Sequence, residues 1–302
     1  MFPGLGAEYP GMVEAFRDRY AWAAPLLARW SEILGCDLSA QDAGGPEERE
    51  SLRQFRIHAL NLLWWRAAGA AGMEPAREFA CCGHSLGFYA ALVAAGALTE
   101  ESSLHWLRTV FTAAWQEFSA NPGKIAVITT TAAVDPHRLA GQFSVEVMAK
   151  NSARQIVVYG AEPDIARLCR SLEAILLRNS DLGTRLPFHS ISMLSVCDRV
   201  AKMADKAGLT VEQPTRPVWS HLTGELLSSS ASIRATLLEQ PCRTVLWEKL
   251  MYNLQKHYHA EFVEIGPSRI LSQLLRWNDA DAKVRHVDHL RTAAKPAART
   301  PS

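Results

Sequence analysis

The sequence has no excess of charge of either sign and no block of like charges. It carries 32 Lys and Arg against 31 Asp and Glu, a formal net charge of +1. Binding of nucleic acid through its phosphates needs a basic surface, so we expect no nucleic-acid partner. No apolar run reaches the length of a membrane span, and the start lacks the basic and apolar segments of a secretory signal. We therefore expect a cytoplasmic protein with no membrane partner.

Cysteine is also scarce, with six residues in a chain of 302, and none of them has the Cys-x-x-Cys spacing. Cys81 and Cys82 are neighbours in an apolar run, where a metal site or a disulfide between them is disfavoured. We expect reduced thiols and no metal. Hydrophobic residues make up 48% of the chain, enough for the core of one large domain or two smaller ones.

The most informative segment is Gly-His-Ser-Leu-Gly at 83–87. It follows an apolar run over 79–82 and precedes a helix of small residues over 88–95. This context is typical of the turn that presents a nucleophilic serine between a strand and a helix. The N-terminus of that helix offers free N–H groups to a developing oxyanion. The alternative is an ordinary strand-turn-helix in which the serine only caps the helix, and the two placed glycines favour the nucleophile.

The pattern of elements predicts an α/β fold. Helices are expected over 12–35, 52–71 and from Thr99 to 118, and the alternation of strands and helices around the 83–87 turn favours a parallel sheet. The middle of the chain has the order β-α-β-β-α-β of a ferredoxin-like unit. Its strands are expected over 124–130, 145–149, 155–160 and 185–188, and its helices over 135–143 and 163–177. We interpret residues 1–120 and 190–290 as a large subdomain, 121–189 as a small inserted one and 291–302 as a disordered tail.

Six segments, in order along the chain, resemble one family: the acyltransferases typified by malonyl-CoA:acyl-carrier-protein transacylase and polyketide synthase acyltransferase domains. They are 2–6 (FPGLG), 83–87 (GHSLG), 151–158 (NSARQIVV), 187–193 (PFHSISM), 223–224 (TG) and 263–267 (VEIGP). The resemblance implies an α/β-hydrolase-like large domain with a ferredoxin-like insert, in agreement with the pattern of elements.

The resemblance also implies a reaction. Ser85 would attack an acyl thioester, and His189 would act as its base and later as the acid for the leaving thiolate. The backbone N–H groups of Leu86 and Leu5 would form the oxyanion hole, with Leu5 in place of the family's glutamine. The acyl group would pass to an acyl carrier protein. No cofactor is expected beyond the phosphopantetheine that the carrier protein or coenzyme A brings.

Further roles follow from the same resemblance. The carbonyl that orients the histidine is expected near His257. The substrate pocket is expected to include Gln54, His84, Val110, Phe111, Asn151 and Phe188. A generic α/β-hydrolase instead places its histidine last in the chain, which makes His286 and His289 the alternatives to His189.

The sequence departs from the family where malonyl-type enzymes carry an arginine for the substrate carboxylate. The matching positions hold Val110 and Phe111, and Arg108, one helical turn before Phe111, is an alternative source of charge. We expect an acyl group without a terminal carboxylate, such as a polyketide starter or intermediate. Phe88 replaces an acidic residue after the 83–87 motif, and an apolar site entrance is expected from it.

Three functions remain open at this point. The leading one is an acyltransferase that acts on an acidic carrier protein, for which a basic rim of Arg53, Arg56, Arg269 and Arg276 is a candidate. The second is an acyl-thioester hydrolase on the same fold, because loss of the arginine fits it equally well. The third is a non-catalytic docking subunit, and the intact serine and histidine argue against it.

Overall fold

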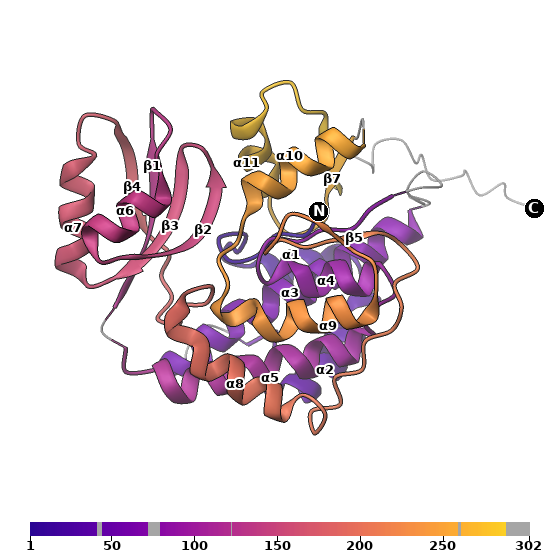
Figure 1. Cartoon of the computed structure of the whole chain (residues 1–302). Coiled ribbons are helices and arrows are strands. Elements are labelled where there is room, and N and C mark those ends of the chain that lie inside the picture. The colour runs from indigo at the N-terminus through magenta and orange to yellow at the C-terminus, as the bar shows by residue number, and fades with distance from the viewer. Residues whose placement is uncertain (41–43, 72–78, 122, 259–260, 288–302) are drawn as a thin grey trace, which may run out of the picture.

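The computed structural model describes residues 1–40, 44–71, 79–121, 123–258 and 261–287, and the tail expected over 291–302 lies outside this part. Figure 1 shows a helical body beside a separate four-stranded sheet. The helices of the body are α1 (Met12–Arg19), α2 (Ala23–Leu34), α3 (Pro46–Ala70), α4 (Gly87–Ala94), α5 (Glu100–Phe118), α8 (Leu194–Met203), α9 (Ser230–Glu239), α10 (Trp247–His257) and α11 (Ile270–Asn278). No helix in these ranges is long and apolar enough to cross a membrane.

A narrow parallel sheet runs through the body. The strand β5 (Val218–Trp219) pairs with Cys81, and Gly83 pairs with Phe2, both in parallel. Met1 exchanges backbone hydrogen bonds with the segment of β7 (Phe262–Glu264), which pairs in parallel with β8 (Val284–His286). A short β6 (Leu226–Leu227) lies antiparallel beside β5. The expected parallel sheet is therefore present, and it supports residues 81–83 just before the serine turn.

The inserted unit has the expected ferredoxin-like topology. Its strands are β1 (Lys124–Thr130), β2 (Glu146–Ser152), β3 (Gln155–Gly160) and β4 (Leu176–Asp181), in the antiparallel order β2-β3-β1-β4. Apolar residues of α6 (Pro136–Phe143) and α7 (Glu162–Ser171) pack with Ile128 and Val158 on one face. Alternate positions such as Val127 and Thr129 point to the other face, toward the body.

The last strand of the insert was predicted in the wrong place. The helix expected over 163–177 ends at Ser171, and β4 occupies Leu176–Asp181 instead of 185–188. Leu172 and Ile175 continue the apolar spacing of the helix, which hid the strand that follows. Residues 185–188 form an irregular connection that carries the chain from the insert to His189.

Two helices also differ from their prediction. The helix expected over 12–35 is split between α1 and α2, and Pro25 lies in the first turn of α2, where its missing N–H costs no hydrogen bond. The helix expected over 52–71 begins earlier, at Pro46. A proline at the first helical position followed by Glu47 and Glu48 is a favourable helix N-terminus.

Candidate active site

Ser85 lies at the turn between the parallel sheet and α4. Its φ of 52° is in the left-handed region, which is uncommon for a residue other than glycine and holds the side chain at the apex of the turn. A Cβ at Gly87 would lie 2.0 Å from the carbonyl oxygen of Phe2. Only glycine allows this approach, so the strand beside the turn and the turn itself fix the position of Ser85 together.

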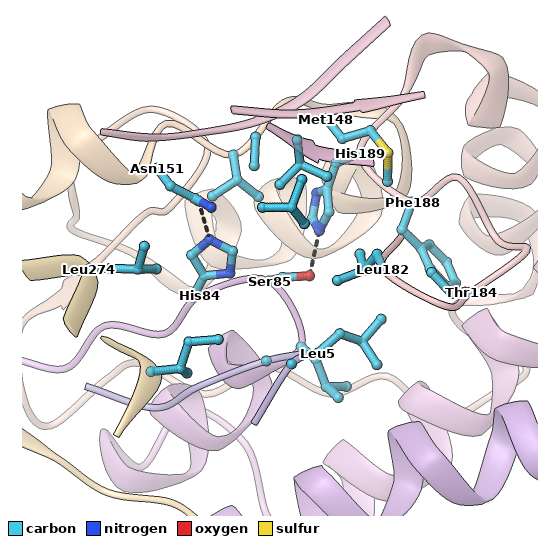
Figure 2. Close-up of a pocket in the computed structure, with 18 of the residues that line it drawn as sticks. Leu5, His84, Ser85, Met148, Asn151, Leu182, Thr184, Phe188, His189 and Leu274 are labelled. Atoms are coloured by element: carbon cyan, nitrogen blue, oxygen red, sulfur yellow. Dashed lines mark hydrogen bonds between the residues drawn. The ribbon is translucent and has the colours of Figure 1, made fainter. Parts of the chain in front are cut away.

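Ser85 and His189 meet across 104 residues of sequence. The Ser85 Oγ lies 2.6 Å from the His189 Nε2, and the two side chains face each other in Figure 2. His189 has a φ of 72°, and its backbone N–H donates to the carbonyl of Pro241 over 2.6 Å. This is hydrogen-bond distance for a general base and the hydroxyl that it deprotonates.

The carbonyl that orients His189 belongs to Arg243. The His189 Nδ1 lies 3.0 Å from the Arg243 carbonyl oxygen, which can only accept, so Nδ1 carries the proton and Nε2 is free to accept from Ser85. The assignment of this carbonyl to His257 is therefore wrong. His257 ends α10 and packs against Trp219. The sequence gives no signal for Arg243, because only its backbone takes part.

Burial keeps the His189 imidazole neutral. It lowers the pKa of His189 to about 4, the Arg243 carbonyl opposes the shift and the nearby His84 adds to it. A second buried imidazole, His221, makes an edge-to-face contact with His189 at 5.9 Å between ring centroids. Burial lowers the pKa of His221 as well. Both rings are therefore neutral at physiological pH, and His189 is ready to accept a proton.

Two backbone N–H groups are available beside Ser85. Within the described ranges, the N–H groups of Leu5 and Leu86 donate to no other residue. A Cβ at Gly4 would lie 3.4 Å from the Leu86 nitrogen, which shows how closely the loop that carries Leu5 approaches the turn. Gln240 also donates from its Nε2 to the Ser85 carbonyl over 3.3 Å. The pair of N–H groups can stabilise an oxyanion formed on an acyl group at Ser85.

His84 connects the serine turn to the inserted sheet. Its Nε2 lies 2.8 Å from the Asn151 Oδ1, and Asn151 donates to Gln155 over 3.0 Å. Gln155 in turn donates to the Thr129 hydroxyl over 3.1 Å. The chain of hydrogen bonds runs from the turn through β2 and β3 to β1. These hydrogen bonds fix the position of the inserted sheet relative to the turn that carries Ser85.

A cavity of about 720 Å³ lies between the body and the insert, and Ser85 and His189 line it. This volume is in the range of small-molecule sites. All the predicted pocket residues also line it: Gln54, His84, Val110, Phe111, Asn151 and Phe188. The wall includes a mostly apolar group made of Tyr89, Leu107, Val110, Phe111, Leu186 and Phe188.

Phe88 does not lie at the site entrance, contrary to the expectation. It is fully buried behind the turn and packs on His221, with ring centroids 4.7 Å apart. Position 88 is in the first turn of α4 and points into the core, which the sequence pattern cannot distinguish from the cavity side. His286 is also buried away from the serine, 3.1 Å from the Gly266 carbonyl oxygen through its Nε2. His289 lies outside the described residues.

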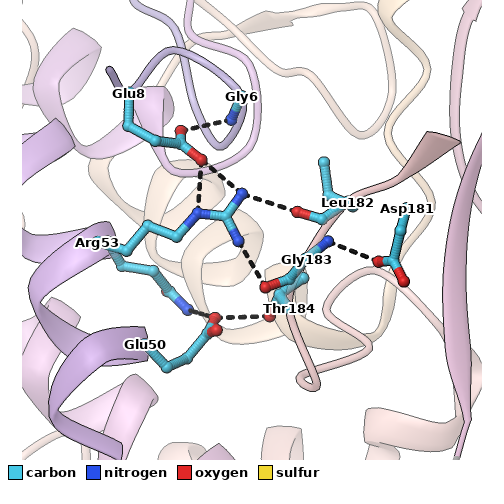
Figure 3. Close-up of polar contacts among 9 residues, drawn as sticks. Gly6, Glu8, Glu50, Arg53, Asp181, Leu182, Gly183 and Thr184 are labelled. Atoms are coloured by element: carbon cyan, nitrogen blue, oxygen red, sulfur yellow. Dashed lines mark hydrogen bonds and ion pairs between the residues drawn. The ribbon is translucent and has the colours of Figure 1, made fainter. Parts of the chain in front are cut away.

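Two of the arginines expected on the basic rim have structural contacts instead. Arg53 pairs with Glu8 and donates to the carbonyls of Leu182 (2.7 Å) and Gly183 (2.8 Å), as Figure 3 shows. Arg56 donates to the Leu38 carbonyl over 2.9 Å. Arg53 lies on α3 and the two carbonyls directly follow β4, so these hydrogen bonds connect the insert to the body beside the cavity.

Comparisons with known proteins agree with this geometry. The model of the acyl transferase domain family matches residues 57–286. The malonyl CoA-acyl carrier protein transacylase of Bacillus subtilis (strain 168) is 27% identical over 286 residues, which cover 91% of this chain and 88% of the relative. The erythronolide synthase EryA2 of Saccharopolyspora erythraea is 27% identical over 282 residues, 90% of this chain and 8% of that protein.

A crystal structure of malonyl-CoA:acyl carrier protein transacylase from Xanthomonas oryzae pv. oryzae superimposes with a TM-score of 0.83. It has 28% identity, and the match covers 95% of this chain and 92% of that one. The family model spans well over half of the present sequence, and the fold agrees over nearly all of it. The chain belongs to the acyl transferase domain family and is an acyltransferase.

Proposed function

We propose that the chain moves an acyl group from a thioester to an acyl carrier protein through an ester on Ser85. The contact of 2.6 Å between the Ser85 Oγ and the His189 Nε2 carries this proposal. Relatives named malonyl CoA-acyl carrier protein transacylases support the carrier protein as partner. The phosphopantetheine arm then belongs to the substrates, on the carrier protein or on coenzyme A.

The geometry supports two steps, acylation of Ser85 and transfer of the acyl group to the carrier protein, in which His189 takes and returns a proton. His189 takes the proton of Ser85 as the Oγ bonds to the thioester carbon, and the N–H groups of Leu5 and Leu86 stabilise the oxyanion. The C–S bond then breaks, and the leaving thiolate takes the proton from the His189 Nε2. In the second step the thiol of the carrier protein gives its proton to His189 and attacks the ester, and Ser85 leaves with that proton.

The acyl group of this proposal has no terminal carboxylate. Val110 and Phe111 are buried where a substrate-binding arginine is expected, and Arg108 faces away, with its Nη1 donating to the Ile33 carbonyl over 2.9 Å. Arg53 lines the cavity, but its charge is paired with Glu8 and each of its three side-chain nitrogens already donates a hydrogen bond, and Arg178 is exposed on β4, where water screens its charge. A malonyl carboxylate buried among these apolar walls is left unpaired, at a cost of several kcal/mol.

Polyketide or related natural-product biosynthesis is the proposed setting. Curated relatives include a non-reducing polyketide synthase of Aspergillus flavus, 29% identical over 300 residues, and the Saccharopolyspora erythraea synthase. An acidic carrier protein needs a basic surface. Arg269 and Arg276 remain exposed near the cavity, beside its lining residues Ile270 and Gln273.

A two-stage acylation experiment tests the proposal. The protein is loaded in a single turnover with a panel of coenzyme A thioesters, including acetyl, butanoyl and malonyl, and the mass on Ser85 is followed. Phosphopantetheinylated carrier protein or buffer is then added. Transfer predicts that the carrier protein speeds the loss of acyl-Ser85 and gains the acyl mass. Equal loss with carrier and with buffer supports the hydrolase, and no adduct with any thioester supports a non-catalytic role.

A further inference from the structure

A series of hydrogen bonds centred on the Glu50 carboxylate ends at Gln54, a residue that lines the cavity. The Leu186 N–H donates to the Thr184 Oγ1 over 3.2 Å, and the Thr184 hydroxyl donates to the Glu50 Oε1 over 2.6 Å. The Gln54 Nε2 donates to the same Glu50 oxygen over 2.9 Å. Figure 3 shows the Glu50 carboxylate facing Thr184. Glu50, Gln54 and Thr184 are 8%, 3% and 7% exposed, so the contacts are shielded from water.

The chemistry of Glu50 decides how the Gln54 amide is turned. An ionised carboxylate only accepts hydrogen bonds, so Gln54 must direct its NH₂ group toward Glu50. The hydrogen bonds of Thr184 agree with this arrangement, because its oxygen accepts from the Leu186 N–H and its proton goes to the same Glu50 oxygen. The amide oxygen, Oε1, makes no hydrogen bond to any residue that the structure describes. Since Gln54 lines the cavity, this part of the wall offers an acceptor.

Two cations line the same cavity as Gln54, but Arg53 is paired with Glu8 and donates to the carbonyls of Leu182 and Gly183, and Arg178 is exposed to water, so neither offsets that acceptor. Val110 and Phe111 line the same cavity and are buried. Tyr89 also lines it, and burial raises the pKa of the phenol, so the ring keeps its proton and stays neutral. A carboxylate on the acyl chain would meet an acceptor backed by the Glu50 charge. An ammonium would lose its hydration against apolar walls. A neutral hydroxyl satisfies the Gln54 oxygen at the smallest desolvation cost.

We propose that Gln54 is a specificity residue that accepts a hydrogen bond from a hydroxyl on the acyl chain, with Glu50 and Thr184 as its positioning residues. The substrate class is then a hydroxyacyl thioester. This inference rests on the proposed acyl-Ser85 chemistry and adds which acyl group is preferred. A site built to bind a hydroxyl discriminates strongly against the analogue that lacks it, because its own polar group is then left unpaired.

The test is a competition between matched coenzyme A thioesters: 3-hydroxybutanoyl against butanoyl, and 4-hydroxybutanoyl against butanoyl. The ratio of acyl-Ser85 products, read by mass spectrometry, cancels any general loss of activity. We expect the wild-type protein to favour one hydroxylated member by tenfold or more, and Gln54→Met to lower that ratio about tenfold, because Met has similar length and no acceptor. Thr184→Val should lower the ratio in the same direction, and Thr184→Ser should restore it.

The outcomes separate this inference from the proposed function. Absence of acyl-Ser85 with every thioester overturns the proposed function. Acyl-Ser85 that forms with no preference for either hydroxylated member, or with a ratio that Gln54→Met leaves unchanged, overturns the inference alone. If Gln54→Met does not fold, as circular dichroism would show, the Thr184 pair decides: equal ratios in Thr184→Val and Thr184→Ser contradict the positioning chain.

Discussion

Acylation of Ser85 should remain fast well below neutral pH. His189 must be neutral to take the serine proton, and burial lowers its pKa to about 4. At pH 5 a group with this pKa is about 90% neutral, whereas an imidazole with the ordinary pKa of about 6.5 is only about 3% neutral. The structure therefore predicts an acylation rate at pH 5 that is about 30-fold higher than an unperturbed histidine would allow.

The assay is single-turnover acylation with one coenzyme A thioester between pH 4 and pH 8, with the mass of acyl-Ser85 measured over time. At limiting thioester, the acid limb of kcat/KM reports the pKa of the free enzyme. Tryptophan fluorescence at each pH verifies that the protein is folded, since Trp106 and Trp247 are buried in the two main cores. An acid limb centred near pH 6.5 in folded protein would refute the argument that His189 is desolvated.

Three further predictions concern the pocket and the stability of the fold. Val110→Arg or Phe111→Arg should raise malonyl acylation relative to butanoyl, and no change in both variants contradicts the pocket argument. Arg53→Met should lower the free energy of unfolding in urea by about 2 kcal/mol, whereas Arg29→Met, whose side chain is 63% exposed, should change it by less than about 1 kcal/mol. Burial lowers the pKa of His58 to about 3, so the folded state excludes a proton that the unfolded state binds below about pH 6.5. The free energy of unfolding should therefore decrease as the pH is lowered from about 6.5 toward about 3. His58→Gln should reduce the slope of the free energy of unfolding against pH in this range by about 1.4 kcal/mol per pH unit.

Local sequence was sufficient to predict the serine turn and most of the insert. The 83–87 segment encodes its own geometry, since the glycines permit the close approach that the turn requires. The strands Lys124–Thr130 and Gln155–Gly160 have the predicted bounds, because each has a short apolar run rich in β-branched residues at its centre. The position of β4 was predicted wrongly because apolar residues at helical spacing continue past the end of α7 up to the start of the strand.

Contacts between distant segments needed more than local pattern. The choice of His189 rested on the family resemblance, because nothing within the sequence alone relates it to Ser85, 104 residues away. The Arg243 carbonyl could not be predicted, since every residue has the same backbone acceptor and only the fold selects one. The role of Arg53 could not be predicted either, because the sequence does not distinguish an arginine that connects two subdomains from one on an open surface.

Acyl transfer by this chain requires that Ser85 becomes esterified with His189 as its base. The most direct measurement is intact-mass and peptide mapping after a single turnover with an acyl thioester. We expect one acyl group on the peptide that contains Ser85, no adduct in Ser85→Ala, and acylation slowed about 10²–10⁴-fold in His189→Ala. An acyl group on another residue, or wild-type rates in His189→Ala, would contradict it.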